Sequence, residues 1–310
     1  MFAQVSATSS DATPLVAAAL LLGATIASYL AVRATHDAGR SRGPASLIVP
    51  GVLPATLLSL AAAWVGLPDL AMTLPIALAV ACMTLVAGLA LINQPDSDSN
   101  APDDLPSSAG VLLLPAALAA LVVVQGGAMA TLDLGLLAAC GVAVLVAGAR
   151  RALLPAPIGW VQVAAAGLLT VAGGWLAWHG AGGLDVAGRP GGQALTGMIL
   201  VGPMLAVPLI RPAINSSSNG SATGTLVALA MTAGLLVTLI PALVAGMLLL
   251  LGETVPASPR LSSIDLPILA VVSLLTLPAM LGRWRLGPIE GLGLVVLFVA
   301  YLVLGGATSR

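Results

Sequence analysis

The fold is decided by the stretch from Val49 to Leu89, which reads V-P-G-V-L-P-A-T-L-L-S-L-A-A-A-W-V-G-L-P-D-L-A-M-T-L-P-I-A-L-A-V-A-C-M-T-L-V-A-G-L. Two apolar runs flank a G-L-P-D segment, a composition typical of a tight turn. Both runs are apolar on nearly every face, and both contain an internal proline, Pro54 and Pro75. The stretch therefore predicts two membrane spans whose helices are interrupted in the manner of a transporter core.

The composition of the whole chain is that of a multi-pass membrane protein. Of its 310 residues, 59% are hydrophobic and 7% are charged, and the mean hydropathy is +1.08. Soluble domains do not spread so little charge over such a length. The net charge of −1 gives no basis for a nucleic-acid partner. The first 14 residues contain no Lys or Arg, so we expect the first apolar run to be a retained span and not a signal peptide.

The sequence offers little for catalysis or for holding a cofactor. Cys82 and Cys140 lie inside apolar runs, and neither has a Cys or His at metal-ligand spacing. His36 and His179 are isolated near the ends of predicted spans. We therefore expect no catalytic residue, no metal and no cofactor, and a protein that is not an enzyme.

A helix that crosses a bilayer needs about 20 mainly apolar residues. Ten runs meet or approach this length, which predicts an all-α bundle of ten spans. They are Leu15–Val32, Ser46–Val65, Leu70–Ile92, Gly110–Gly126, Leu132–Ala149, Ile158–His179, Gln193–Ile210, Gly224–Leu251, Leu266–Leu281 and Ile289–Gly305. In the long eighth span, Pro241 predicts a kink.

The arginines predict the orientation, because cytoplasmic loops are enriched in basic residues. With the N-terminus outside, the cytoplasmic loops hold 8 of the 11 basic residues, all of which are arginine. The opposite orientation leaves only 3 inside. We expect an inner (cytoplasmic) membrane protein with both termini on the non-cytoplasmic side. Polar segments 93–108 and 215–223 are expected to be loops on the cytoplasmic side.

The two halves of the chain, 1–150 and 151–310, resemble each other. The first span and the sixth are followed by D-A-G-R and D-V-A-G-R, respectively. The fifth span opens with T-L-D-L-G-L and the tenth with P-I-E-G-L-G-L, so Asp133 and Glu290 take matching places. Because each half has an odd number of spans, the second is inverted relative to the first. This is the inverted repeat of many secondary transporters, in which the working site lies at the midplane between the halves.

Several segments resemble one family, the cation/calcium exchanger superfamily, which includes the sodium/calcium exchangers. L-P-A-T-L-L-S-L-A-A-A, from Leu53 to Ala63, is similar to the family's G-T-S-L-P-E-L motif and its continuation. The following P-D-L-A matches the opening of the family's next motif. In the second half, Gly197–Ile210 resembles the equivalent span, with Pro208 in the place of Pro54, and Gly287–Leu304 looks like the family's last span.

The departures from this resemblance concern the ion ligands. In the family, each half supplies a glutamate to the cation, and these places fall on Ala55 and Leu209. The family's glycine, asparagine and serine ligands fall on Thr73, Leu74, Leu78 and Ala79. Calcium takes six to eight oxygen ligands with carboxylates among them. The only acidic residues we assign to the predicted core are Asp133 and Glu290, at span ends, so we expect no calcium exchange.

A diverged transport site is the best remaining candidate. It comprises Pro54, Ala55, Thr56, Ser59, Thr73, Pro208 and Thr225. We expect the hydroxyls of Thr56, Ser59, Thr73 and Thr84 to bond the carbonyl one helical turn back.

Two functions stay open. The first is a secondary transporter with a diverged site, and the second is a non-transporting structural or assembly subunit that binds partner helices or lipid. The Asp-rich loop at 93–108 invites comparison with membrane prenyltransferases, but it lacks the arginines that bind diphosphate and a second acidic cluster. Drug/metabolite transporters share the ten-span plan, but their cytoplasmic termini disagree with the arginine count.

Overall fold

The computed structural model describes residues 47–64, 66–94, 113–125, 131–149, 196–218, 222–255, 259–281 and 284–307, with a few isolated residues near 26–30 and 168–173. Every element assigned within these ranges is helical. Five helices in this part of the chain are long and apolar enough to cross a membrane: Pro68–Ile92, Gly197–Ser218, Ala222–Leu250, Leu261–Met280 and Pro288–Ala307. The structure is thus an all-α membrane protein, as the composition predicts.

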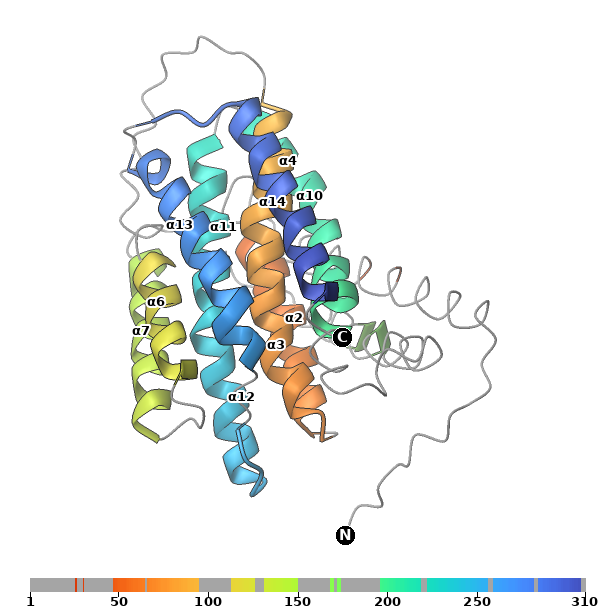
Figure 1. The fold of residues 1–310 in the computed structure, drawn as a ribbon, viewed down its shortest axis with the longest axis vertical. Coiled ribbons are helices and arrows are strands. Elements are labelled where there is room, and N and C mark those ends of the chain that lie inside the picture. The colour runs from red at the N-terminus through yellow and green to blue at the C-terminus, as the bar shows by residue number, and fades with distance from the viewer. Residues whose placement is uncertain are drawn as a thin grey trace.

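The helices run roughly parallel and antiparallel to one long axis, as Figure 1 shows. Three of them contain one π-helical turn, labelled η. In chain order they are α2 (Ile48–Trp64), α3 (Pro68–Ala81) with η2 (Cys82–Val86) and α4 (Ala87–Ile92), α6 (Leu113–Gln125), α7 (Thr131–Ala149), η3 (Gly197–Val201) with α10 (Gly202–Ser218), α11 (Ala222–Val237), α12 (Leu239–Leu250), η4 (Leu261–Asp265) with α13 (Leu266–Met280), and α14 (Pro288–Ala307).

Eight of the predicted spans overlap these helices, and the other two, Leu15–Val32 and Ile158–His179, lie outside the described ranges. Two boundaries are wrong. The helix of the seventh span continues to Ser218 instead of ending at Ile210, so Asn215–Ser218 is helical and not loop. The ninth begins at Leu261, not Leu266, and the π-helical turn that precedes Leu266 buries Leu261 and Asp265.

The predicted turn between the second and third spans is a glycine cap. Gly66 has φ +82°, a conformation that costs glycine little because it has no Cβ. Its N–H donates to the Ala63 carbonyl (3.2 Å), and the Leu67 N–H donates to the Ala62 carbonyl (2.9 Å). These two bonds form a Schellman motif, which satisfies the last carbonyls of α2. Pro68 then starts α3 at a position where no N–H is needed.

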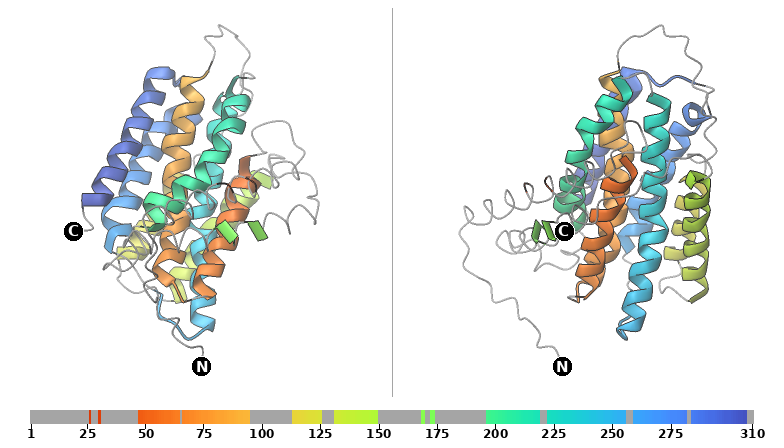
Figure 2. Two further views of the ribbon diagram at one scale, coloured as in Figure 1. Left: turned by 90° about the vertical axis from the view of Figure 1, so that its right-hand side faces the viewer. Right: turned by 180° about the vertical axis from the view of Figure 1, so that it is seen from behind.

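Helix α3 lies at the centre of the bundle. All twelve residues from Leu70 to Ala81 are buried. The helix contacts α2, α10, α11 and α12, so it is surrounded by other helices of the protein. In the left view of Figure 2, the continuous helix that ends in α4 lies between α14 and α10.

The contacts around this centre come in pairs. Helix α14 packs along α4, and α7 packs along α12. In the same way, α10 contacts α4, and α2 contacts α12. The continuous helix α3–η2–α4 and the pair α11–α12 therefore have corresponding neighbours.

The eighth span is interrupted at Thr238, between α11 and α12, where φ is −113° and ψ is −65°. Pro241 lies three residues later and has no N–H to donate, so the carbonyl of Val237 loses its helical partner. The Thr238 hydroxyl donates to the Gly234 carbonyl at 2.7 Å. The predicted kink is present, and it begins one turn before the proline that causes it.

Helices α4 and α14 approach each other at two glycines. A Cβ on Gly88 would lie 2.7 Å from the Gly291 carbonyl oxygen, and a Cβ on Gly291 would lie 2.7 Å from the Gly88 oxygen. Both obstacles are backbone atoms, which cannot turn aside. Small residues of this kind let membrane helices pack closely where lipid supplies no hydrophobic driving force.

Gly88→Ala is expected to push α4 and α14 apart and to lower the free energy of unfolding by about 1–3 kcal/mol, the usual cost of overpacking. Thermal unfolding of the purified protein in detergent measures this loss. Gly246→Ala on α12 is the control, because nothing lies within 4 Å of its Cβ position. Equal melting temperatures for the two variants would contradict the assignment of this contact.

Candidate functional site

The residues of the predicted transport site lie on the four central helices. All of them except Thr56, which is half-buried, are buried. Helix α2 supplies Pro54, Ala55, Thr56 and Ser59; α3 supplies Thr73; α10 supplies Pro208; and α11 supplies Thr225. Ala55 and Ser59 are each 0% exposed. The central crossing, defined as the region where α2 and α10 meet α3 and α11, is therefore closed by protein atoms.

Most hydroxyls in these helices bond within their own helix, as predicted. Thr56 donates to the Val52 carbonyl at 2.8 Å, Thr73 to the Asp69 carbonyl at 2.7 Å, and Thr84 to the Val80 carbonyl at 2.6 Å. Thr232 on α11 repeats the pattern with Ala228 at 2.9 Å. These bonds satisfy the hydroxyl protons in a region without water.

Ser59 is the exception to this pattern. Its hydroxyl is fully buried and has no hydrogen-bond partner among the described residues. Buried polar groups without a partner are uncommon and costly. Ser59 is thus the one hydroxyl of the candidate set whose proton has no acceptor among the described residues.

Two residues of the candidate set lie far apart. Thr73 lies near the start of η3, because a Cβ on Gly197 would be 3.0 Å from its hydroxyl oxygen. Thr225 donates to the hydroxyl of Ser216, near the end of α10, at 2.9 Å. Nearly the full length of η3 and α10 separates these positions, so the two threonines do not share one site.

The helices of the central crossing touch each other at glycines. A Cβ on Gly51 of α2 would lie 2.5 Å from the Thr232 methyl group of α11. On the other side, a Cβ on Gly202 of α10 would lie 3.0 Å from the Ala77 Cβ of α3. At both points the helices are separated by the thickness of one methyl group or less, which leaves no room for a hydrated ion.

Metal ligands do not gather in the part of the chain that the structure describes. No group of three or more His, Cys, Asp or Glu side chains lies together there. A calcium site needs several carboxylate oxygens among its ligands.

One charged group was missed by the sequence analysis. Asp265 ends the π-helical turn η4, inside the ninth span, and is 1% exposed. Asp133 and Glu290 are therefore not the only acidic residues of the membrane helices. The predicted ninth span begins at Leu266 and so leaves out the segment R-L-S-S-I-D, in which Arg260 and Asp265 lie about one helical turn apart.

Asp265 belongs to a buried polar cluster that joins three spans. The Nε atom of Arg260 lies 3.9 Å from its carboxylate Oδ1. The hydroxyl of Tyr301 on α14, which is 0% exposed, lies near the same carboxylate but makes no hydrogen bond with the described residues. The Arg260 guanidinium also contacts the sulfur of Met198 in η3, and Gly305 of α14 leaves space for both side chains. The cluster holds the ends of spans seven, nine and ten together.

No protein-family model matches the sequence, and no curated protein matches it. Solved structures do share the fold. The sodium–calcium exchanger NCX_Mj, soaked with Na⁺ and no Ca²⁺, matches at TM-score 0.58 and 14% identity over 94% of this chain and 99% of that chain. YfkE matches at TM-score 0.64 and 16% identity, covering 93% and 91%. The H⁺/Ca²⁺ exchanger CAX matches at TM-score 0.59 and 15% identity, covering 94% and 85%. The resemblance in sequence therefore extends to a shared fold.

Asp265→Leu is expected to leave the partly buried Arg260 without its counter-charge and to lower the free energy of unfolding by about 3 kcal/mol, the lower end of the cost for a buried pair. Replacing both partners, Arg260→Leu with Asp265→Leu, is expected to cost less than the sum of the two single changes. Thermal unfolding in detergent gives the double-mutant cycle. Glu253→Gln, at an exposed position, serves as a neutral control. Strict additivity would show that the pair does not interact.

Proposed function

We propose that this chain is a multi-pass membrane protein that uses the exchanger fold without exchanging calcium. The closed central crossing carries the proposal. In that region Ala55 and Leu209, the positions at which the family resemblance places glutamates, are both 0% exposed. A bare divalent cation between these side chains would lack compensating charge, which is very costly at membrane depth.

The packing of the neighbouring positions supports the same proposal. Leu74 and Ala79, which fall on ligand places of the family, are 0% exposed within α3. The hydroxyls nearby donate to carbonyls of their own helices. A calcium ion would need to displace apolar side chains and find six to eight oxygens.

Two inverted five-span halves, 1–150 and 151–310, form the architecture that we propose for this single membrane domain of ten spans. Pro54 and Pro208 are separated by 154 positions, and so are Thr84 and Thr238. Both threonines are buried, and both donate to the carbonyl four residues earlier. The paired helix contacts, α14 on α4 and α7 on α12, are those that a two-fold relation between the halves would produce.

The arginine distribution supports an inner-membrane location with both termini on the non-cytoplasmic side. In this orientation the connection between α13 and α14 lies on the cytoplasmic side. So does the end of α10 that carries the bond between Ser216 and Thr225.

A second candidate is a structural or assembly subunit that binds partner helices or lipid. One observation favours it: α14 presents a long apolar outer face. Its exposed residues are Ile289, Leu292, Val296, Val299, Val303 and Leu304. A face of this kind contacts lipid or another membrane helix.

In vesicles that carry the purified wild-type protein, we expect no sodium- or proton-driven uptake of calcium-45. Ala55→Glu is the gain-of-site comparison, since it restores one carboxylate at the crossing. Empty vesicles give the background rate. Gradient-dependent uptake by the wild type would overturn the proposal.

Water access to the crossing can be tested with Ser59→Cys, a nearly isosteric change, in a Cys140→Ala background. We expect no reaction with a membrane-permeable maleimide, because position 59 is 0% exposed and the remaining native thiol, Cys82, is equally buried. Thr254→Cys, at an exposed position, is the labelled control. Rapid labelling at position 59 would indicate a water-filled transport path and favour a transporter over a structural subunit.

A further inference from the structure

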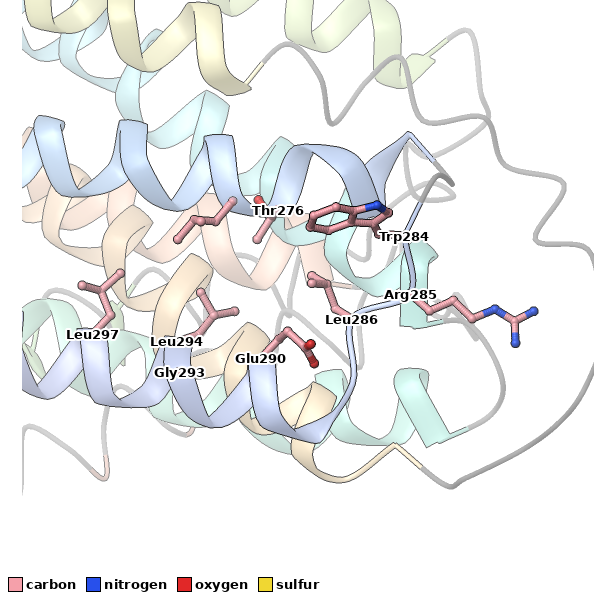
Figure 3. A pocket seen from close by; sticks show the side chains of 9 residues that line it. Thr276, Trp284, Arg285, Leu286, Glu290, Gly293, Leu294 and Leu297 are labelled. Carbon is pink, nitrogen blue, oxygen red and sulfur yellow. The ribbon is translucent and has the colours of Figure 1, made fainter.

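An open groove separates α13 from α14 on the outside of the bundle, away from the central crossing. Its cavity has a volume of about 790 Å³, within the range of about 300–1,000 Å³ usual for small-molecule sites. Figure 3 shows side chains of both helices facing one another across it. The lining residues are Leu275, Thr276, Trp284, Arg285, Leu286, Glu290, Gly293, Leu294 and Leu297.

The groove has an apolar part and a charged mouth. Leu275 on α13 and Leu294 and Leu297 on α14 line its length. The charged residues, Arg285 and Glu290, lie at the end where the chain turns from one helix to the other. The groove therefore suits an amphipathic ligand whose hydrocarbon tail lies along the leucines and whose polar head lies at the charged mouth.

The surroundings of the groove are those of a lipid-facing surface. Both helices that form the groove expose large apolar side chains: α13 exposes Leu274 and Leu275, and α14 exposes Leu292 and Val296. Trp284, at the charged mouth, is 68% exposed. Tryptophan is enriched at the level of lipid headgroups, where its ring meets both water and hydrocarbon. A lipid therefore reaches this groove laterally from the bilayer and does not pass through water.

The two charges at the mouth have opposite signs and different partners. The Oε2 atom of Glu290 accepts a hydrogen bond from the Gly287 N–H at 2.8 Å, which fixes the carboxylate at the start of α14. Its second oxygen is free to accept from a ligand. Arg285 makes no hydrogen bond or ion pair with the residues that the structure describes, and it is exposed. The mouth thus offers one donor group for an anion and one acceptor group for a cation.

We propose that this groove binds an aminophospholipid of the phosphatidylethanolamine class. The Arg285 guanidinium donates to the lipid phosphate, a geometry in which arginine is effective. Glu290 accepts from the lipid ammonium, and an acyl chain lies along Leu275, Leu294 and Leu297. A lipid with both a phosphate and a primary ammonium satisfies both charges, whereas phosphatidylglycerol would leave Glu290 facing an anionic headgroup. Phosphatidylcholine has no N–H to donate.

This inference goes beyond the proposed function and does not depend on it. The groove lies outside the central crossing, so the calcium-uptake result leaves it untouched. Conversely, loss of lipid binding would leave the uptake experiment unchanged.

Native mass spectrometry of the full-length protein in detergent tests the site, with phosphatidylethanolamine, phosphatidylglycerol and phosphatidylcholine of identical acyl chains as probes. We expect phosphatidylethanolamine to bind about ten-fold more tightly than the other two, the equivalent of one charge-assisted hydrogen bond. Arg285→Gln is expected to weaken binding of all three lipids. Glu290→Gln is expected to remove the preference for phosphatidylethanolamine.

Matched variants separate the site from general charge and folding effects. Arg211→Gln on α10 and Glu253→Gln after α12 remove exposed charges elsewhere and are expected to leave binding unchanged. Gly293→Phe fills the groove without altering charge. Nothing lies within 4 Å of the Gly293 Cβ position, so the helix accommodates the ring, and we expect binding to fall about ten-fold with an unchanged melting temperature.

Three outcomes would overturn the proposal. The first is equal affinity for the three lipids in the wild type. The second is tighter binding of phosphatidylglycerol, which would indicate an anionic-lipid site. The third is undiminished phosphatidylethanolamine binding by a folded Gly293→Phe protein, which would place the lipid elsewhere on the surface.

Discussion

The structure depends on the burial of one helix on all its faces. Inside a bilayer, every backbone polar group needs a partner within the protein, so the central helix has only its own turns to satisfy it. The residues of helix α3 are almost all apolar. Thr73 in α3 and Thr84 in the adjoining η2 each donate a hydroxyl proton to a carbonyl one turn back. The surrounding helices then approach it at glycine and alanine. Close packing stabilises a centre built in this way, but its apolar side chains offer few groups that could bind an ion.

The same centre explains how two proteins can share a fold without sharing an ion-binding site. The folds of NCX_Mj, YfkE and CAX are matched over more than 90% of this chain at 14–16% identity. A frame of paired helices needs small residues where helices cross and apolar residues elsewhere, and many sequences meet that requirement. An ion site needs particular oxygens at particular places. The two requirements fall on different positions, so one can be kept while the other changes.

Much of the frame was predictable because hydrophobic length is a direct physical signal of a membrane span. The turn at Gly66 followed from G-L-P-D, and the kink in the eighth span followed from Pro241. The sequence could not reveal Asp265 as a buried group, since its burial depends on Arg260 and on Tyr301, which is 36 positions further along the chain. The helical end of α10 was missed for a related reason: Ser216 and Ser217 look like loop residues, and only their packing against neighbours buries them. Of the candidate site, the hydroxyl bonds were predictable because they are local. The separation of Thr73 from Thr225 was not, because it depends on how α3, α10 and α11 pack.

The π-helical turn η2 has a consequence for how this span tolerates changes in length. A π turn holds one more residue than an α turn over nearly the same rise. Loss of one residue between Cys82 and Val86 would therefore convert the turn to regular α-helix and leave Gly88 still directed at Gly291. A deletion between Leu70 and Ala81 would instead rotate the remainder of the span by about 100°, the angle per residue of an α-helix. The span thus has one place at which its length can vary over evolutionary time while the faces on either side stay in register.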